Sequence, residues 1–390
     1  MDFYLTMSEE EEKFRQELSE FLDQELTYEI CRQHAMDKGL GVEARQFARK
    51  LGEKGWLGLG WPKEYGGSGG GLNYEIILVQ EMARHGARVP NEVARFMAGP
   101  VILHHGSEEV KQEFLPRIAK GEIEFGLGYT EPNAGSDLMA MQMSAEDHGD
   151  YFIINGQKTF NTESHYADYH WLAAKTDPKG LRHQSISLFA VDQQAPGITI
   201  TPIETLGGER SNEVFYDKVK VPRHRLIGNK NEGFSYMIQA LNYERLMLLQ
   251  TEHLFPTMHR LIAYLKKTSC NGVLLSEDPL VRDRLARMRT EAEAAQCLEY
   301  RALAMLINGQ RLDWQSNLVK LFSSEARQRF ASMGMEILGH AGLIEEIDPL
   351  AVSHGEFARL ARCCIVDTIG GGTSEIIRNL TATRGLGLPR

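Results

Sequence analysis

The sequence predicts an α+β multidomain fold, in which an N-terminal α-helical domain, a middle antiparallel β domain and a C-terminal α-helical bundle follow one another. Three observations predict it. Apolar residues recur at helical spacing before residue 125, strand-like runs with no helical pattern between them fill residues 125–232, and long helical patterns return after Phe234. We therefore expect domains over residues 1–124, 125–232 and 233–390.

The composition argues against several classes of protein. Hydrophobic residues make up 42% and charged residues 25% of the 390 residues, as in ordinary globular proteins. The net charge of -10, without any basic run, argues against nucleic-acid and membrane-surface binding. We find no signal peptide and no apolar run of the ~20 residues that a membrane helix needs. The five cysteines show no metal-ligand spacing, so we expect reduced thiols, no metal site and a cytoplasmic location.

The first part begins with a predicted helix. Ser8 and Glu11 form a capping box, in which each side chain satisfies a free backbone N–H group of the other residue. Further apolar stripes at helical spacing follow up to Ile118. Between them, the glycine-rich run from Trp61 to Gly71 must be a loop. It lacks a Gly-Lys-Ser/Thr ending, so we predict a plain turn rather than a phosphate-binding loop.

Strand signals dominate the middle part. Asn155-Gly156 lies between the strand-like runs 151–154 and 157–160, which predicts a hairpin because a type I′ turn needs two residues that accept positive φ. Other strand-like runs cover residues 171–174, 185–191, 198–201 and 214–221. No strand–Gly-x-Gly-x-x-Gly–helix unit is present, which argues against a Rossmann domain.

Long helical patterns return in the last part. They cover residues 234–267, 279–308 and 314–338. Asn308-Gly309 supplies a helix stop between the last two. Helices of this length normally pack as an antiparallel bundle.

Two turn-rich segments are candidate ligand sites. The run from Tyr129 to Asp137 offers backbone N–H groups and short hydroxyls, which suit a polar planar ligand, but a structural turn alone would explain it too. The run from Gly370 to Glu375 precedes a helix, and its glycines allow close backbone approach; a flexible helix entry is the alternative. The 13 histidines show no His-Glu-x-x-His spacing, and Cys363-Cys364 lies in an apolar stretch typical of buried thiols.

Together these segments resemble the flavin-dependent acyl-CoA dehydrogenases, over nearly the whole chain. The motifs that carry the resemblance, in the family's order, are Trp61-Pro62 with Tyr65-Gly66-Gly67, Tyr129 to Asp137, Ile154 to Lys158, Gly372 to Ile376, and Leu386-Gly387-Leu388-Pro389. The resemblance implies FAD as the cofactor, an acyl-CoA thioester as the substrate, and a role in fatty acid or lipid catabolism.

The resemblance also implies which residues bind the cofactor. The backbone of Tyr129 and the side chain of Thr130 would bond the pyrimidine edge of the flavin, and Thr162 would lie near flavin N5. Phe160 replaces the family's usual Trp over the ring, which leaves a smaller aromatic contact. The full implied cofactor set is Leu127, Tyr129, Thr130, Gly135, Ser136, Phe160, Asn161, Thr162, Gly372, Thr373 and Glu375, and the implied substrate contacts are Ser136 and Arg245.

The catalytic base is implied by a vacated position. Many family members place a glutamate directly before the Gly-Thr-Ser of the C-terminal loop, where this chain has Gly371. The subgroup of isovaleryl-CoA and long-chain acyl-CoA dehydrogenases instead places it on a helix before an arginine, and Glu244-Arg245 stands there in this chain. Most Glu-Arg pairs on helices are solvated surface ion pairs, but the vacated loop position favours Glu244 as the base. It would remove the α-proton while flavin N5 accepts the β-hydride, giving a trans-2-enoyl-CoA.

The departures from the family leave an alternative open. In homotetrameric relatives a cationic run reaches a neighbouring subunit's flavin pyrophosphate, but the aligned Cys270-Asn271-Gly272 carries no cation, and His340 stands at a glycine position. Such changes resemble bacterial heterotetrameric members, which often act on bulky or cyclic acyl groups. We expect an active dehydrogenase in a homotetramer or heterotetramer, with an electron-transfer flavoprotein as electron acceptor. The alternative is a non-catalytic or half-site subunit that completes a partner's flavin site.

Overall fold

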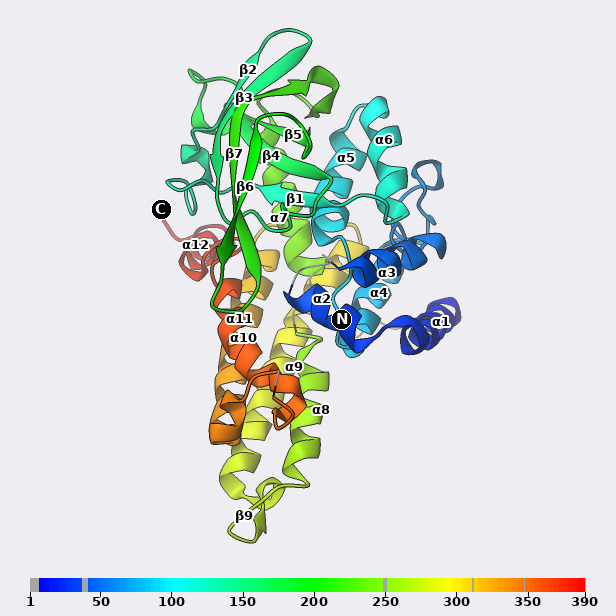
Figure 1. The fold of residues 1–390 in the computed structure, drawn as a ribbon, viewed down its shortest axis with the longest axis vertical. Coiled ribbons are helices and arrows are strands. Elements are labelled where there is room, and N and C mark those ends of the chain that lie inside the picture. Colours follow the sequence, from blue (N-terminus) through cyan, green and yellow to red (C-terminus); the bar gives the residue numbers. More distant parts are fainter. Residues whose placement is uncertain (1–6, 37–40, 248–250, 311, 347, 390) are drawn as a thin grey trace.

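The computed structural model describes residues 7–36, 41–247, 251–310, 312–346 and 348–389. It confirms the three-part fold of helices, then a sheet, then helices. In Figure 1 the sheet lies at one end of the molecule, the N-terminal helices lie beside it, and the long C-terminal helices extend away from it.

The N-terminal part consists of α1 (Glu9–Glu25), α2 (Tyr28–Met36), α3 (Val42–Glu53), α4 (Leu72–Arg84), α5 (Gly99–His105) and α6 (Glu108–Ala119). A π-helical turn over Val93–Ala98 leads into α5. The predicted capping box is confirmed: the Glu11 N–H donates to Ser8 Oγ at 3.2 Å, and the Ser8 N–H donates to the Glu11 carboxylate at 2.7 Å. The run from Trp61 to Gly71 forms turns, as predicted.

The middle part is a mixed, mainly antiparallel sheet. Its strands are β1 (Phe125–Gly128), β2 (Ser144–Asp147), β3 (Tyr151–Lys158), β4 (Tyr169–Lys175), β5 (Ile186–Asp192), β6 (Ile198–Glu204), β7 (Arg210–Pro222) and β8 (Leu226–Ile227). They lie in the order β6-β7-β3-β2-β4-β5-β8, with β1 also paired to β4. The expected antiparallel pairing is correct for most pairs, but β1 and β2 each pair with β4 in parallel.

The predicted hairpin at Asn155-Gly156 is wrong. Strand β3 runs through this dipeptide without interruption and pairs with β7 on both sides of it. The register shifts between Ile154 and Gly156, and a Cβ at Gly156 would lie 3.0 Å from Met143, so the glycine makes a β-bulge at a close approach. Strand β3 instead forms a hairpin with β2, through residues 148–150.

The C-terminal part contains α7 (Gly233–Met247), α8 (Leu254–Leu265), α9 (Pro279–Ile307), α10 (Gln315–Leu338), α11 (Glu356–Asp367) and α12 (Ser374–Leu380). Helices α9 and α10 match the predicted helices 279–308 and 314–338. The single helix predicted over 234–267 is wrong, because α7 and α8 are separate: residues 251–253 form a turn, and residues 248–250 lie outside the described residues.

A short hairpin lies at the far tip of the bundle, where Figure 1 labels β9. Strand β9 (Ser269–Cys270) pairs antiparallel with β10 (Val273–Leu274). Asn271 and Gly272 connect them with φ of 50° and 81°, as a two-residue turn of Asn-Gly favours. The chain has three Asn-Gly dipeptides, and sequence reasoning assigned the hairpin to Asn155-Gly156 instead of Asn271-Gly272.

Helix α7 is the element at which the three parts meet. It contacts the Val93–Ala98 turn of the N-terminal part, β5 of the sheet, and α10 of the bundle. Buried residues of the N-terminal part, the sheet and α7 itself, among them Met97, Leu188 and Leu241, share one apolar cluster on this side of α7. Side chains on α7 are therefore held rigidly between domains. Within the described ranges, none of the helices is both long and apolar enough to cross a membrane.

Candidate active site

The loop after β1 is joined to the segment after β3 by backbone hydrogen bonds. The N–H of Leu127 donates to the carbonyl of Thr162 at 3.0 Å, and the N–H of Thr159 donates to the carbonyl of Thr130 at 2.9 Å. The structure thus brings residues 127–136 and 160–162 together, as one continuous ligand surface requires. Gly135, near the exposed end of the loop, has open space around it, because a Cβ there would meet no atom within 4 Å.

Tyr129 is the residue of this loop that the charge of Glu244, the candidate base, affects. It is 5% exposed, and its Oη accepts a hydrogen bond from Trp171 Nε1 at 2.9 Å. Burial raises the pKa of the Tyr129 hydroxyl; the Trp171 hydrogen bond opposes this change, and the negative charge of Glu244 adds to it. Glu244, half-buried on α7, therefore lies within electrostatic reach of the loop.

A buried ion pair that sequence reasoning missed supports the loop. Lys158, at the end of β3, is 0% exposed, and its Nζ donates to the Tyr129 carbonyl at 3.0 Å and to the Glu131 carboxylate at 2.9 Å. The same carboxylate accepts the N–H groups of Gln142 at 2.6 Å and Met143 at 3.0 Å. Burial lowers the pKa of Lys158 to about 8, and the charge of Glu131 opposes that shift.

Residues 160–162 differ in their surroundings. Phe160 has a φ of 55° and is 64% exposed, so its ring is available to a planar ligand. Asn161 is buried, and its backbone exchanges hydrogen bonds with Asn212, both at 2.9 Å. Its side-chain amide has no hydrogen-bond partner among the described residues. Thr162 is half-buried.

Arg245 ties α7 to the C-terminal loop. Its Nε and Nη2 donate to the Gly371 carbonyl at 3.0 and 2.6 Å, and its Nη1 donates to Asn317 Oδ1 at 2.9 Å and Asn242 Oδ1 at 3.1 Å. Burial lowers the pKa of Arg245 to about 10, against the opposing charge of Glu244. This geometry makes Arg245 a support of the loop; its predicted contact with substrate stays a prediction.

Lys320 of α10 is a second cation at this loop, and sequence reasoning missed it. It is 6% exposed, and its Nζ donates to the Gly372 carbonyl. Burial lowers the pKa of Lys320 to about 8, and the charge of Arg245 lowers it further. Two cations therefore hold successive carbonyls of the glycine loop. The signal in the sequence was the spacing of Lys320, four residues after Ser316 and three before Ser323. This spacing gives a polar stripe on one face of α10, and all three residues are buried.

The vacated base position, Gly371, lies in open space. A Cβ built there would meet no atom within 4 Å, although its φ of 67° disfavours any residue other than glycine. At Gly372 a Cβ would lie 3.2 Å from Ile377 and 3.4 Å from Arg245. Arg245 thus links the segment that carries Glu244 to the segment that carries Gly371.

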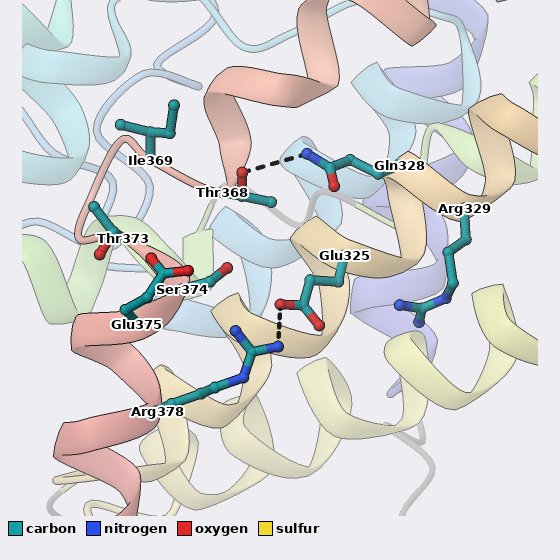
Figure 2. A pocket seen from close by; sticks show the side chains of 9 residues that line it. All are labelled: Glu325, Gln328, Arg329, Thr368, Ile369, Thr373, Ser374, Glu375 and Arg378. Carbon is teal, nitrogen blue, oxygen red and sulfur yellow. Dashed lines mark hydrogen bonds and ion pairs between the residues drawn. The ribbon is translucent and has the colours of Figure 1, made fainter.

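Two of the other predicted cofactor residues, Thr373 and Glu375, line a hollow between α10 and the start of α12, with a volume of about 520 Å³, and Gly372 directly precedes them. Thr373, Ser374 and Glu375 line it together with side chains of α10 and of the end of α11. Figure 2 shows Arg378 of α12 paired with Glu325 of α10, at 2.5 Å. The buried Ser374 Oγ has no hydrogen-bond partner in the described part of the chain.

The predicted cofactor residues therefore form two groups. Residues 127–136 and 160–162 form the first, residues 372–375 form the second, and no residue of the first group lines the hollow of the second. A ligand that contacts both must extend from one to the other, as a dinucleotide does.

Comparison with known proteins decides the family. Models of the N-terminal, middle and C-terminal domains of acyl-CoA dehydrogenases match residues 8–122, 126–219 and 231–386. Acyl-CoA dehydrogenase FadE26 of Mycobacterium tuberculosis is 33% identical, over 99% of this chain and 99% of that protein. The chain belongs to the acyl-CoA dehydrogenase family. Its members are FAD-dependent oxidoreductases that dehydrogenate acyl-CoA thioesters, and this is the activity of the chain.

Solved structures agree with this assignment. The Tcur3481-Tcur3483 steroid ACAD superposes with a TM-score of 0.92 and 34% identity, covering 100% of both chains. The ChsE4-ChsE5 complex from Mycobacterium tuberculosis superposes with a TM-score of 0.90 and 32% identity, covering 99% of this chain and 100% of that one.

The residues of this acyl-CoA dehydrogenase fit FAD. The exposed Phe160 ring and the open space at Gly135 suit a planar isoalloxazine beside the first group. The hollow with its partnerless, buried Ser374 Oγ suits a polar ligand end beside the second group.

Proposed function

We propose that Glu244 is the base of this dehydrogenation and removes the α-proton of the acyl-CoA thioester, which becomes a trans-2-enoyl-CoA. One observation carries the proposal. The charge of Glu244 reaches the Tyr129 hydroxyl in the loop after β1 (residues 129–136, the flavin loop). Its neighbour Arg245 binds the carbonyl of Gly371, the position that a loop base would occupy.

The chemistry fits a half-buried carboxylate on a rigid helix. Partial removal from water makes a carboxylate a better proton acceptor, and positioning by α7 aims it at one atom. Bound FAD supplies the acceptor for the β-hydride, which no side chain can provide. The guanidinium of Arg245 donates hydrogen bonds to Gly371, Asn317 and Asn242. Arg245 therefore orients the helix and the loop around the reacting carbon.

The two groups of residues receive distinct roles in this proposal. The Tyr129 backbone and the Thr130 side chain would bind the pyrimidine edge of the flavin, and Thr162 would bond near N5, with Phe160 supplying an aromatic contact to the ring. The remaining members of the first group, which contact the flavin and its ribityl-phosphate, are Leu127, Gly135, Ser136 and Asn161; Ser136 also borders the acyl chain. Gly372, Thr373 and Glu375 bind the rest of the dinucleotide. The bonds between the two loop segments and the hollow at α12 support this division.

The assembly and the partners are proposed from the relatives. The steroid ACAD and the ChsE4-ChsE5 complex are each named for two chains, which supports an assembly with a second, different chain; the tetramer, homomeric or heteromeric, stays a prediction. The word steroid in the first name, together with the open space at Gly371, supports a bulky acyl group. An electron-transfer flavoprotein would reoxidise the cofactor, and the cytoplasm would be the location.

A second candidate is a half-site subunit of a heteromeric acyl-CoA dehydrogenase, which completes a flavin site on a partner chain. It is favoured by the tip of the bundle, where Cys270, Asn271 and Gly272 form an exposed hairpin without a cation. The occupied position 244 favours the catalytic proposal over this one.

An absorbance spectrum and a substrate titration test the proposal. The full chain, purified alone, is expected to show the oxidised flavin band, and an acyl-CoA ester is expected to bleach it without oxygen. A panel of short, long, branched and ring-containing esters then identifies the acyl group. A chain that binds FAD but is bleached by no ester contradicts the catalytic proposal, and a chain that binds FAD only with a paralogous partner supports the second candidate.

A further inference from the structure

The strongest unexplained feature of the site is the buried pair of Lys158 and Glu131. Lys158 is 0% exposed and Glu131 is 7% exposed, and they lie 2.9 Å apart. Removing two charges from water is expensive, and a buried ion pair often stabilises a protein no better than apolar residues of the same size. Stability alone is therefore a weak reason for placing a charged pair here.

The hydrogen bonds of the pair all converge on the flavin loop and its neighbour. The Lys158 ammonium donates to the Tyr129 carbonyl at 3.0 Å as well as to Glu131. Glu131 in turn accepts the N–H groups of Gln142 and Met143, the residues that lead into β2. The pair thus links Tyr129 and Glu131, the two neighbours of Thr130, to β3 and to the segment that leads into β2.

Further bonds leave Thr130 little freedom. Its carbonyl accepts the Thr159 N–H at 2.9 Å, next to Lys158 in the chain. The Tyr129 ring is held from the other side by Trp171 Nε1. The groups of Tyr129 and Thr130 that these bonds do not use are therefore presented to a ligand in one conformation, which is how binding sites avoid the entropy of ordering a loop.

We propose that Lys158 and Glu131 are positioning residues, which hold the Tyr129-Thr130 backbone in the conformation that binds the polar edge of the cofactor. This inference rests on the proposed function, because it assumes that this loop contacts the flavin. Neither side chain touches the cofactor in this account; each acts through the loop.

The test is a double variant, Lys158→Met with Glu131→Gln, which removes both charges while keeping the size of both side chains. The matched control is Arg225→Met with Glu113→Gln, an ion pair between α6 and the turn after β7, in which Arg225 also lies over the rings of Phe114 and Tyr169. FAD is titrated into the apoprotein of each, and the thermal midpoint is measured with and without FAD.

The double variant is expected to bind FAD at least tenfold more weakly than the wild type, the loss that one or two misplaced hydrogen bonds cause. Its flavin absorption band should also shift, and the stabilisation by FAD should shrink. The control should keep the wild-type dissociation constant and band. An unchanged dissociation constant, with thermal midpoints lowered equally with and without FAD, would show a purely structural pair and overturn the inference.

Two further outcomes are decisive. If the double variant does not fold, Glu131→Gln alone carries the test: weaker FAD binding supports positioning, and wild-type binding contradicts it. If the wild type itself binds no FAD, the proposed function fails together with the inference, whereas a wild type that binds FAD beside an equally competent variant removes the inference alone.

Discussion

Replacing Glu299 by glutamine is expected to remove a loss of stability that the wild type shows as the pH rises. Glu299 lies on α9, is 2% exposed, and accepts hydrogen bonds from Thr251 and from Ser323. Burial raises its pKa to about 7 from 4.5; the Thr251 hydrogen bond opposes this shift, and the charge of Glu252 adds to it.

The direction of the effect follows from proton binding. Between pH 4.5 and about 7 the folded protein keeps a proton on Glu299 that the unfolded chain has lost. The stabilising contribution is therefore complete below pH 4.5 and is lost as the pH rises through about 7. The difference between the two pKa values corresponds to about 3 kcal/mol of unfolding free energy.

Glutamine has no proton to lose, and the two hydroxyl groups can hydrogen-bond an amide as well as a carboxyl group. The variant should thus gain up to about 3 kcal/mol over the wild type between pH 5 and pH 8. Urea unfolding followed by circular dichroism at both pH values measures this. Glu293→Gln, at an exposed position on the same helix, is the control. A difference between Glu299→Gln and wild type that is the same at both pH values would refute the reasoning.

Three other predictions concern the site and the assembly. Thr162→Val should slow flavin reduction by roughly fivefold or more, since one hydrogen bond is worth about 1 kcal/mol, and an unchanged rate in a rapid-mixing experiment counts against its place at N5. In a Glu244→Gln background, Gly371→Glu should restore part of the activity, because position 371 has open space; its positive φ costs about 1 to 2 kcal/mol in stability, and a folded double variant with no gain over Glu244→Gln would contradict the geometry. Light scattering at micromolar concentration should find an oligomer, and a 44.0 kDa species would contradict this.

The sequence predicted the architecture well because periodicity reports burial. Strands β4 to β7 and the two longest helices, α9 and α10, appear within a few residues of the predicted ranges, whereas β1, β2 and β8 were not predicted. The errors arose where the same short sequence is compatible with two backbone conformations. Asn155-Gly156 and Asn271-Gly272 carry the same dipeptide, but the first is a bulge inside β3 and the second is a hairpin turn. Only the partner strand β7 distinguishes them.

The resemblance supplied the residues that are proposed to contact the ligands, but the residues that support them were missed. The resemblance named Glu244, Tyr129 and Thr373 because family motifs contain them. Lys158 and Lys320 were missed because a lysine is normally exposed. In β3, however, Phe152 and Ile154 are buried on the face that also receives Lys158. A cation on a buried face is a detectable signal for a carboxylate or carbonyl partner, although the sequence does not say which one.

The central claim is that Glu244 removes the α-proton, and single-turnover flavin reduction of Glu244→Gln tests it most directly. Glutamine keeps the shape of the side chain and removes its proton affinity. Glu232→Gln, which changes an exposed carboxylate just before α7, is the control. With an acyl-CoA ester that bleaches the wild type, Glu244→Gln should still bind FAD and substrate, but its flavin should be reduced ~10²–10⁴-fold more slowly. Reduction at the wild-type rate would contradict the assignment of Glu244 as the base.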